Sequence, residues 1–242
     1  MLLQRRLMEN ITNNISNADT TGYKKEHLVS HSFDEVLVKR INDPHVLSQT
    51  PRVGPLNMGT QIDQLYINFD EGNLEGTQRS TDLAIVGDAF FVVGTPAGER
   101  YTRSGAFYID DAGYLVDGEG NFLLGGNGPI YVGGMNFTVD TQGGVRAGDA
   151  VENSDQIRVV SFADNGSLRK QGSNLYFSME APQAAPNQYR MAQGFLEGSN
   201  VDIGREMVDM LSVFRTYETN QRMLTMIDET VGKAVNEIGR LR

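Results

Sequence analysis

The sequence predicts an α+β protein in which a central all-β domain lies between N- and C-terminal helices that pair as a coiled coil. Apolar residues repeat with helical spacing at both ends of the 242-residue chain, whereas between about 60 and 195 they alternate in short bursts. Turn-forming Asn-Gly and Asp-Gly pairs separate these bursts. We therefore expect the domain to be an open barrel or a sandwich of short antiparallel strands.

Four segments are expected along the chain. They are an N-terminal helical arm over 1–43, an extended linker over 44–59, the all-β domain over 60–196, and a long C-terminal helix over 197–242. The linker is predicted because Pro44, Pro51, Pro55 and Gly54 fall within 44–59.

The first helix is expected over residues 1–17. One of its faces is apolar and repeats every four residues, at Leu3, Leu7, Ile11 and Ile15. An amide stripe runs beside it, at Asn10, Asn13, Asn14 and Asn17. Asparagine is a mediocre helix former, so the stripe is either a solvated face near a frayed end or a set of hydrogen-bonding contacts to neighbouring helices in an assembly. Gly22, followed by Tyr23, is expected to stop the helix in a turn.

A second, weaker helical pattern follows, at Phe33, Val36, Leu37 and Ile41. His27 and His31 are four residues apart on this segment, the spacing of a zinc-binding pair on a helix. No third ligand is marked by spacing, so we expect a solvated surface and no metal.

The predicted strands of the central domain are short. They cover 65–69, 83–86, 90–93, 107–109, 114–116, 122–124, 130–132, 137–139, 157–162 and 175–179. Residues 181–186 are expected to be a loop that returns the chain towards the last helix.

The C-terminal segment carries the strongest pattern. Its positions with alternating spacing of four and three are Ile203, Met207, Met210, Phe214, Tyr217, Gln221, Leu224, Asp228, Val231, Val235 and Ile238, and nine of these eleven are apolar. This is coiled-coil patterning. A helix of this length is about 60 Å long and requires a partner along its apolar face.

Composition excludes several classes of function. The net charge of −10 argues against nucleic-acid binding, and the absence of cysteine excludes disulfides and thiolate metal sites. No apolar run has the length of a membrane span, and the start of the sequence has no secretory signal pattern. If the protein leaves the cytoplasm, we expect a route that reads something other than a cleaved signal.

No motif predicts catalysis, and we expect no catalytic residue, cofactor or metal. The loop at Asp117 only faintly resembles a calcium loop, because its twelfth position is Gly128 and not glutamate. Asp82 and Asp88 flank an apolar strand and are better explained by turn and edge roles. Two other classes stay open. A secreted β-domain enzyme or carbohydrate-binding module with a helical oligomerisation tail would show converging carboxylates in a cleft, and a cytoplasmic coiled-coil adaptor would form a stable dimer without filaments.

Four blocks of sequence closely resemble the signatures of flagellar basal-body rod and hook proteins. The blocks cover residues 13–24, residues 71–77 with 82–93, residues 101–107 with 113–116, and residues 196–202 with 206–208 and 217–220. They occur in the family's order and span nearly the whole chain. The long insertions of hook proteins are absent, which favours a rod protein.

The resemblance implies a structural subunit whose terminal helices form the inner tube of the rod and whose β domain decorates the outside. It implies contacts with copies of itself and with other rod and hook subunits, and export through the flagellar type III apparatus to the basal body. It also favours assembly contacts for the amide stripe. Members of the family usually carry about ten more residues before the position of Met1, so we expect either a first helix shortened at its start or a misassigned start of the sequence.

Overall fold

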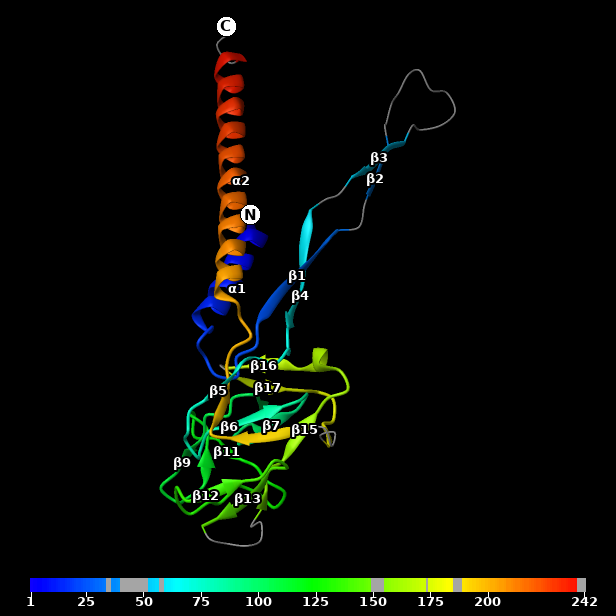
Figure 1. Cartoon of the computed structure of the whole chain (residues 1–242). Helices are drawn as coiled ribbons and strands as arrows, with labels where there is room; N and C mark the ends of the chain where they lie inside the picture. Colours follow the sequence, from blue (N-terminus) through cyan, green and yellow to red (C-terminus); the bar gives the residue numbers. More distant parts are fainter. Residues whose placement is uncertain are drawn as a thin grey trace. The chain divides into compact units, whose positions relative to one another are not determined.

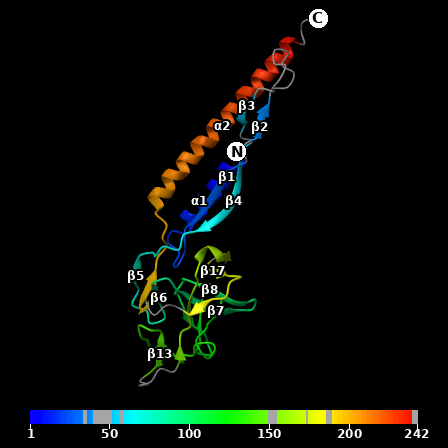
Figure 2. The same ribbon diagram turned by 90° about the vertical axis from the view of Figure 1, so that its right-hand side faces the viewer.

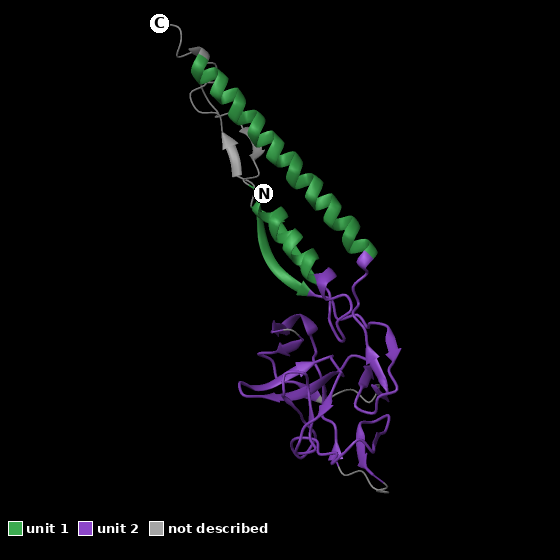
Figure 3. Cartoon of the chain, turned by 90° about the vertical axis from the view of Figure 1, so that its left-hand side faces the viewer, with its two compact units in different colours: residues 1–13, 26–66, 204–242 green, residues 14–25, 67–203 purple. Residues whose placement is uncertain are grey.

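The computed structural model describes residues 1–33, 36–39, 52–56, 59–148, 155–172, 174–184 and 189–238. The chain divides into two compact units, coloured separately in Figure 3. Unit 1 comprises residues 1–13, 26–66 and 204–242, and unit 2 comprises residues 14–25 and 67–203.

The helices are α1 (Leu2–Ser16) and α2 (Ile203–Ile238), with a short 3₁₀ helix at Asn165–Ser167. The strands of the first third are β1 (Glu26–Ser32), β2 (Val36–Lys39), β3 (Arg52–Leu56), β4 (Thr60–Ile67) and β5 (Leu74–Gly76). The next are β6 (Leu83–Val86), β7 (Phe90–Thr95), β8 (Gly98–Thr102), β9 (Tyr108–Ile109), β10 (Leu115–Val116), β11 (Phe122–Leu123), β12 (Phe137–Val139) and β13 (Gly144–Ala147). The last are β14 (Asp155–Gln156), β15 (Val159–Ser161), β16 (Arg169–Gln171), β17 (Leu175–Phe177), β18 (Gln183–Ala184), β19 (Arg190–Gln193) and β20 (Phe195–Glu197).

The α2 helix is a single continuous helix of 36 residues (Figure 1), about 54 Å long at 1.5 Å per residue. The predicted long C-terminal helix is therefore confirmed. It contains no proline, and Glu206 in its first turn lies at the positive end of the helix dipole. Neither helix in the described part of the chain is long and apolar enough to cross a membrane.

The second predicted helix is wrong where the structure describes it. Residues 36–39 form β2, which pairs antiparallel with β3, so residues 52–56 of the predicted linker also form a strand. Of the two other pattern residues, Phe33 follows β1 outside any helix, and Ile41 lies outside the described residues. Val36 and Val38 are β-branched and favour a strand, and pairing across the hairpin supplies the backbone hydrogen bonds that a helix would have supplied.

The strand β1 lies next to β4 in a two-stranded ribbon that Figure 2 shows from the side. This geometry removes the basis of the histidine pair. Residues four apart on a strand are about 13 Å apart, and the structure places His31 Nδ1 3.9 Å from Asp63 Oδ2. No group of three metal-binding side chains occurs among the described residues.

Unit 2 is built on a nine-stranded sheet. Its main strand order is β16-β17-β8-β7-β11-β10-β9, and β15 pairs with β7 and with β18. The structure is α+β and its strands do not close into a barrel. The strand β7 lies at the centre, next to β8, β11 and β15, and each pairing is antiparallel. The predicted loop at 181–186 contains β18, which pairs with β15.

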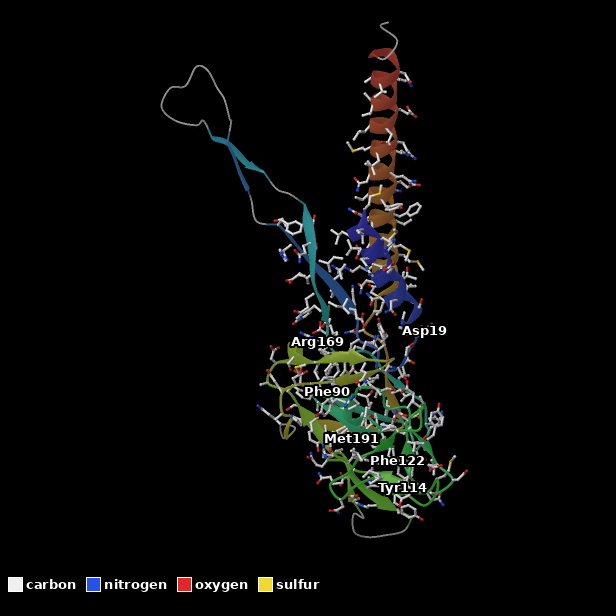
Figure 4. The ribbon with its side chains drawn as sticks, turned by 180° about the vertical axis from the view of Figure 1, so that it is seen from behind. Asp19, Phe90, Tyr114, Phe122, Arg169 and Met191 are labelled. Carbon is white, nitrogen blue, oxygen red and sulfur yellow. The ribbon has the colours of Figure 1, made fainter. Side chains whose placement is uncertain are left out.

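The two faces of β7 contact two separate cores. Phe91 and Val93 belong to one cluster, with Leu115, Phe107 and other residues, and Phe90 and Val92 belong to the other. Phe90 and Met191 are labelled inside unit 2 in Figure 4. Because both faces are covered, the strand is a continuous apolar run rather than an alternating one.

Close backbone packing at Gly105 gives a first prediction. A Cβ atom at this position would lie 1.5 Å from the carbonyl oxygen of Leu83, so Gly105→Ala must displace a backbone segment of the core. We expect it to lower the free energy of unfolding of unit 2 by at least about 3 kcal/mol. Gly118→Ala is the matched control, because nothing lies within 4 Å of its Cβ position. Equal urea midpoints for the two variants would contradict this.

Candidate functional site

The side chains of the predicted seams are only partly covered. On α1, Ile11 is buried and Leu3, Leu7, Asn10 and Ile15 are half-buried. On α2, the exposed seam residues are Ile203, Met207, Phe214, Gln221, Leu224, Val231 and Val235, and the half-buried ones are Met210 and Tyr217. The side chain of Ile238 lies outside the described residues. The apolar face of α2 thus remains exposed along its length, and a coiled-coil pairing of the two helices is not established within one chain.

The amide stripe is not uniform. Asn14 is 1% exposed, and its Oδ1 accepts a hydrogen bond of 3.1 Å from the buried Tyr23 hydroxyl. Asn17 is half-buried and Asn13 is exposed. At least Asn14 therefore has a role inside the chain, since it holds the last turn of α1 to the turn that contains Tyr23.

A buried charged cluster lies in unit 2, where the segment that follows α1 meets the segment that precedes α2. We name it the junction cluster and define it as Lys24, Arg103 and Glu197. The side chains of Lys24 and Glu197 are 0% and 1% exposed, and the Lys24 Nζ to Glu197 Oε1 distance is 2.6 Å. The cluster connects residue 24 to residue 197 through side chains that water does not reach.

Glu197 has a partner for each carboxylate oxygen. Its Oε1 also accepts a hydrogen bond of 3.0 Å from the backbone N–H of Gly72. Its Oε2 lies 3.4 Å from Nη1 of Arg103. One buried carboxylate thus neutralises part of the charge of two buried cations, and the arrangement depends on that carboxylate.

The two cations are held by backbone carbonyls as well. Lys24 Nζ donates to the carbonyl oxygen of Asp70 at 2.6 Å. Arg103 donates to the carbonyl oxygens of Ile85 and Gly87 at 3.2 and 2.7 Å. Burial lowers the pKa of Lys24 below its ordinary value of 10.5, and Glu197 opposes this shift.

Backbone contacts join the same two segments. The N–H of Gly22 donates to the carbonyl oxygen of Glu197 at 2.7 Å, and the N–H of Lys25 donates to Oδ1 of Asn200 at 2.7 Å. Gly22 has a φ of +68°, and a Cβ there would lie 2.4 Å from the backbone nitrogen of Ser104. Glycine is therefore required both by the left-handed backbone and by the close approach.

The three residues of the junction cluster were not predicted as a site. Only Arg103 has a local signal in the sequence, as a charged residue among small and apolar residues between Tyr101 and Phe107. Such residues are rarely fully buried without a partner. A search for buried charges of opposite sign in distant blocks could have found them.

The carboxylates considered for catalysis have structural roles or are isolated. Asp117 Oδ1 accepts hydrogen bonds from the backbone N–H groups of Glu119 and Asn121 at 2.8 and 2.9 Å. These two hydrogen bonds close the loop and occupy that oxygen. Asp88 is exposed. Asp82 is 1% exposed and lies next to Arg79, whose Nε is 4.0 Å from its Oδ1.

Three family models match the chain. They are described as Flagella basal body rod protein over residues 1–24, Flagellar hook protein FlgE/F/G D1 domain over 84–172, and Flagellar basal body rod FlgEFG protein C-terminal over 192–237. The first and last of these contain residues 24 and 197 of the junction cluster, and the second contains residue 103.

Curated relatives match over nearly their whole length. The flagellar hook-basal body complex protein FlhO of Bacillus subtilis (strain 168) is 31% identical over 262 residues, which cover 100% of this chain and 96% of the relative. The flagellar basal-body rod protein FlgG of the same organism is 32% identical and covers 93% and 91%. The flagellar basal-body rod protein FlgF of Caulobacter vibrioides is 31% identical and covers 98% and 94%.

Proposed function

The chain belongs to the flagellar basal-body rod protein family and is a structural subunit of the rod, and from this we propose that it polymerises through its terminal helices into the tube that transmits torque through the cell envelope. The predicted membership of the family is confirmed, and so is the preference for a rod protein. The family consists of structural proteins of the basal body, where the subunit associates with other rod and hook subunits.

The observation that carries the proposal is the exposed apolar face of α2. Met207, Leu224 and Val235 are 52%, 51% and 66% exposed, although each occupies a seam position. Contiguous apolar surface of this kind marks a protein interface. Copies of one chain that meet head to tail build open helical filaments when the rotation does not close.

The proposed position of each segment in the rod follows the four segments expected from the sequence. The arm over 1–43 and the segment over 197–242 that contains α2 form the inner core, the segment 44–59 crosses between layers, and the β domain over 60–196 lies outside. The seam residues of both helices, together with Asn10 and Asn17, make the contacts between subunits as a coiled coil, whereas the buried Asn14 bonds within its own chain. The turn at Gly22 and Tyr23 connects the first helix to the β domain.

The junction cluster supports a mechanical role. It ties the segment that leads out of α1 and the segment that leads into α2 to one rigid unit, so a load on either helix passes into the same buried group of side chains. We propose in addition that the subunit reaches the envelope unfolded, through the flagellar type III export apparatus and without a cleaved signal peptide, and that it carries out no catalysis.

Polymerisation of the purified chain tests the proposal. We expect light scattering and negative-stain images to show concentration-dependent filaments for the full chain. Variants that lack residues 1–13 or 204–242 should form none, because each deletion removes nearly all of one helix and leaves the residues of unit 2 in place. A small oligomer that survives both deletions would contradict assembly through the terminal helices.

A further inference from the structure

The chain contains two Asn-Gly pairs, Asn127-Gly128 and Asn165-Gly166. In such a pair the backbone nitrogen of the glycine can attack Cγ of the asparagine side chain. Glycine permits this attack because it has no Cβ atom to shield its nitrogen or to restrict its backbone. Since glycine follows the asparagine in both pairs, the two sites differ mainly in their structural surroundings.

The first pair lies in a short turn after β11, the strand whose Phe122 is labelled in Figure 4. Leu124 and Pro129 form an antiparallel bridge across the base of the turn. Inside it, the N–H of Gly125 donates to the carbonyl oxygen of Gly128 at 2.6 Å. The base is therefore fixed, and the exposed Asn127 lies near the tip.

The reacting groups of the first pair are not engaged within the described part of the chain. Neither the side chain of Asn127 nor the N–H of Gly128 forms a hydrogen bond there. Gly128 has a φ of +132°, and nothing lies within 4 Å of the position that a Cβ would take. The turn therefore has room for a five-membered ring between the two residues.

The reacting groups of the second pair are engaged. Asn165 begins the 3₁₀ helix Asn165–Ser167 and is half-buried. The N–H of Gly166 donates to Oδ1 of Asp164 at 2.7 Å, and the carbonyl oxygen of Asn165 accepts from the N–H of Leu168 at 3.2 Å. Attack by the Gly166 nitrogen must first break a hydrogen bond to a carboxylate, which is among the stronger hydrogen bonds in proteins.

We propose that Asn127 is a site of spontaneous deamidation and that Asp164 protects Asn165 from the same reaction. A bond forms between the nitrogen of Gly128 and Cγ of Asn127, and the bond from Cγ to the amide nitrogen breaks. The proton of the Gly128 nitrogen leaves with that amide as ammonia, which gives a succinimide ring. One water molecule then opens the ring by adding hydroxide to one of its two carbonyl carbons and a proton to its nitrogen. The product is aspartate or isoaspartate, and the overall reaction consumes only water.

The product changes the charge and the backbone of the turn. Each reaction adds one negative charge to a chain whose net charge is already −10. A Cβ at the adjacent Gly126 would lie 3.8 Å from Oδ1 of Asp155, so the new carboxylate arises next to a residue that contacts an existing one. In a subunit that is not replaced, the product accumulates, and its fraction records the age of the subunit. The inference is independent of polymerisation.

Peptide mass spectrometry of the full chain, incubated folded in mildly alkaline buffer made with heavy-oxygen water, tests the proposal. We expect Asn127 to convert at least about tenfold faster than Asn165, with heavy oxygen in the product. In urea the two rates should be similar, because the structural difference is lost. Similar rates in the folded chain would overturn the proposal.

Variants test each half of the proposal. Asn127→Gln should abolish the more acidic species that isoelectric focusing detects in the incubated chain, because glutamine must form a larger ring. Asp164→Ala should raise the rate at Asn165 about tenfold. The matched control Asp164→Asn keeps an acceptor oxygen and should leave Asn165 slow. An unchanged rate in Asp164→Ala, or an equal rise in Asp164→Asn, would overturn the protective role of the hydrogen bond.

Discussion

Replacing Glu197 by glutamine is expected to lower the free energy of unfolding of unit 2 by about 3–5 kcal/mol. The change is nearly isosteric, but it removes the negative charge that faces Lys24 at 2.6 Å and Arg103 at 3.4 Å. Both cations would remain buried without compensation. The corresponding loss in melting temperature is about 6–20 °C. Near-ultraviolet circular dichroism of the nine tyrosines in the chain would follow the transition.

Two further variants make this result specific. Glu180→Gln removes the same charge from an exposed position and should change stability by less than about 0.5 kcal/mol. The double variant Lys24→Met with Glu197→Gln should be more stable than Glu197→Gln alone, because one uncompensated cation is gone. If Glu197→Gln matched Glu180→Gln, the cluster would not have the structural importance that its burial indicates.

Replacing Leu224 by proline is expected to abolish incorporation into filaments and to leave unit 2 folded. Leu224 lies within the 36-residue helix α2, where proline removes a backbone hydrogen bond and costs about 3 kcal/mol or more. A kink there would misalign the seam positions on its two sides. Sedimentation of filaments measures incorporation, and the tyrosine signal of unit 2 reports whether the β fold is intact.

Leu224→Met is the matched control for this change. It keeps an apolar side chain of similar volume and a strong helix former, so filaments should form as with the original chain. Normal incorporation of the proline variant would contradict assembly along a continuous α2 seam. Loss of the tyrosine signal would show that α2 and unit 2 fold together, contrary to the expectation.

The sequence predicted the elements whose pattern is local. The helix α2 and strands such as β7 follow from the spacing of apolar residues, which reports one face of a helix or the buried faces of a strand. The segment around Val36 was misassigned because four residues of a hairpin can match a helical spacing by chance, and only pairing with residues 52–56 decides the outcome.

The buried pair of Lys24 and Glu197 in the junction cluster could not be predicted from local pattern. Lys24 and Glu197 are 173 residues apart, and nothing near either one indicates burial. The seam positions, by contrast, were recognisable at once, although the surface that packs against them remains a prediction. The spacing of apolar residues identifies which face of a helix must be buried. Which surface packs against that face depends on the fold or on the assembly.

The position of Glu197 late in the chain sets an order for folding. Lys24, Gly72 and Arg103 all precede it, and each depends on its carboxylate. A chain threaded from its N-terminus through a narrow passage emerges with these partners exposed to water and with no counter-charge to bury. Contacts of such large separation also form slowly. In such a passage unit 2 could not be completed until Glu197, more than three quarters of the way along the chain, had emerged.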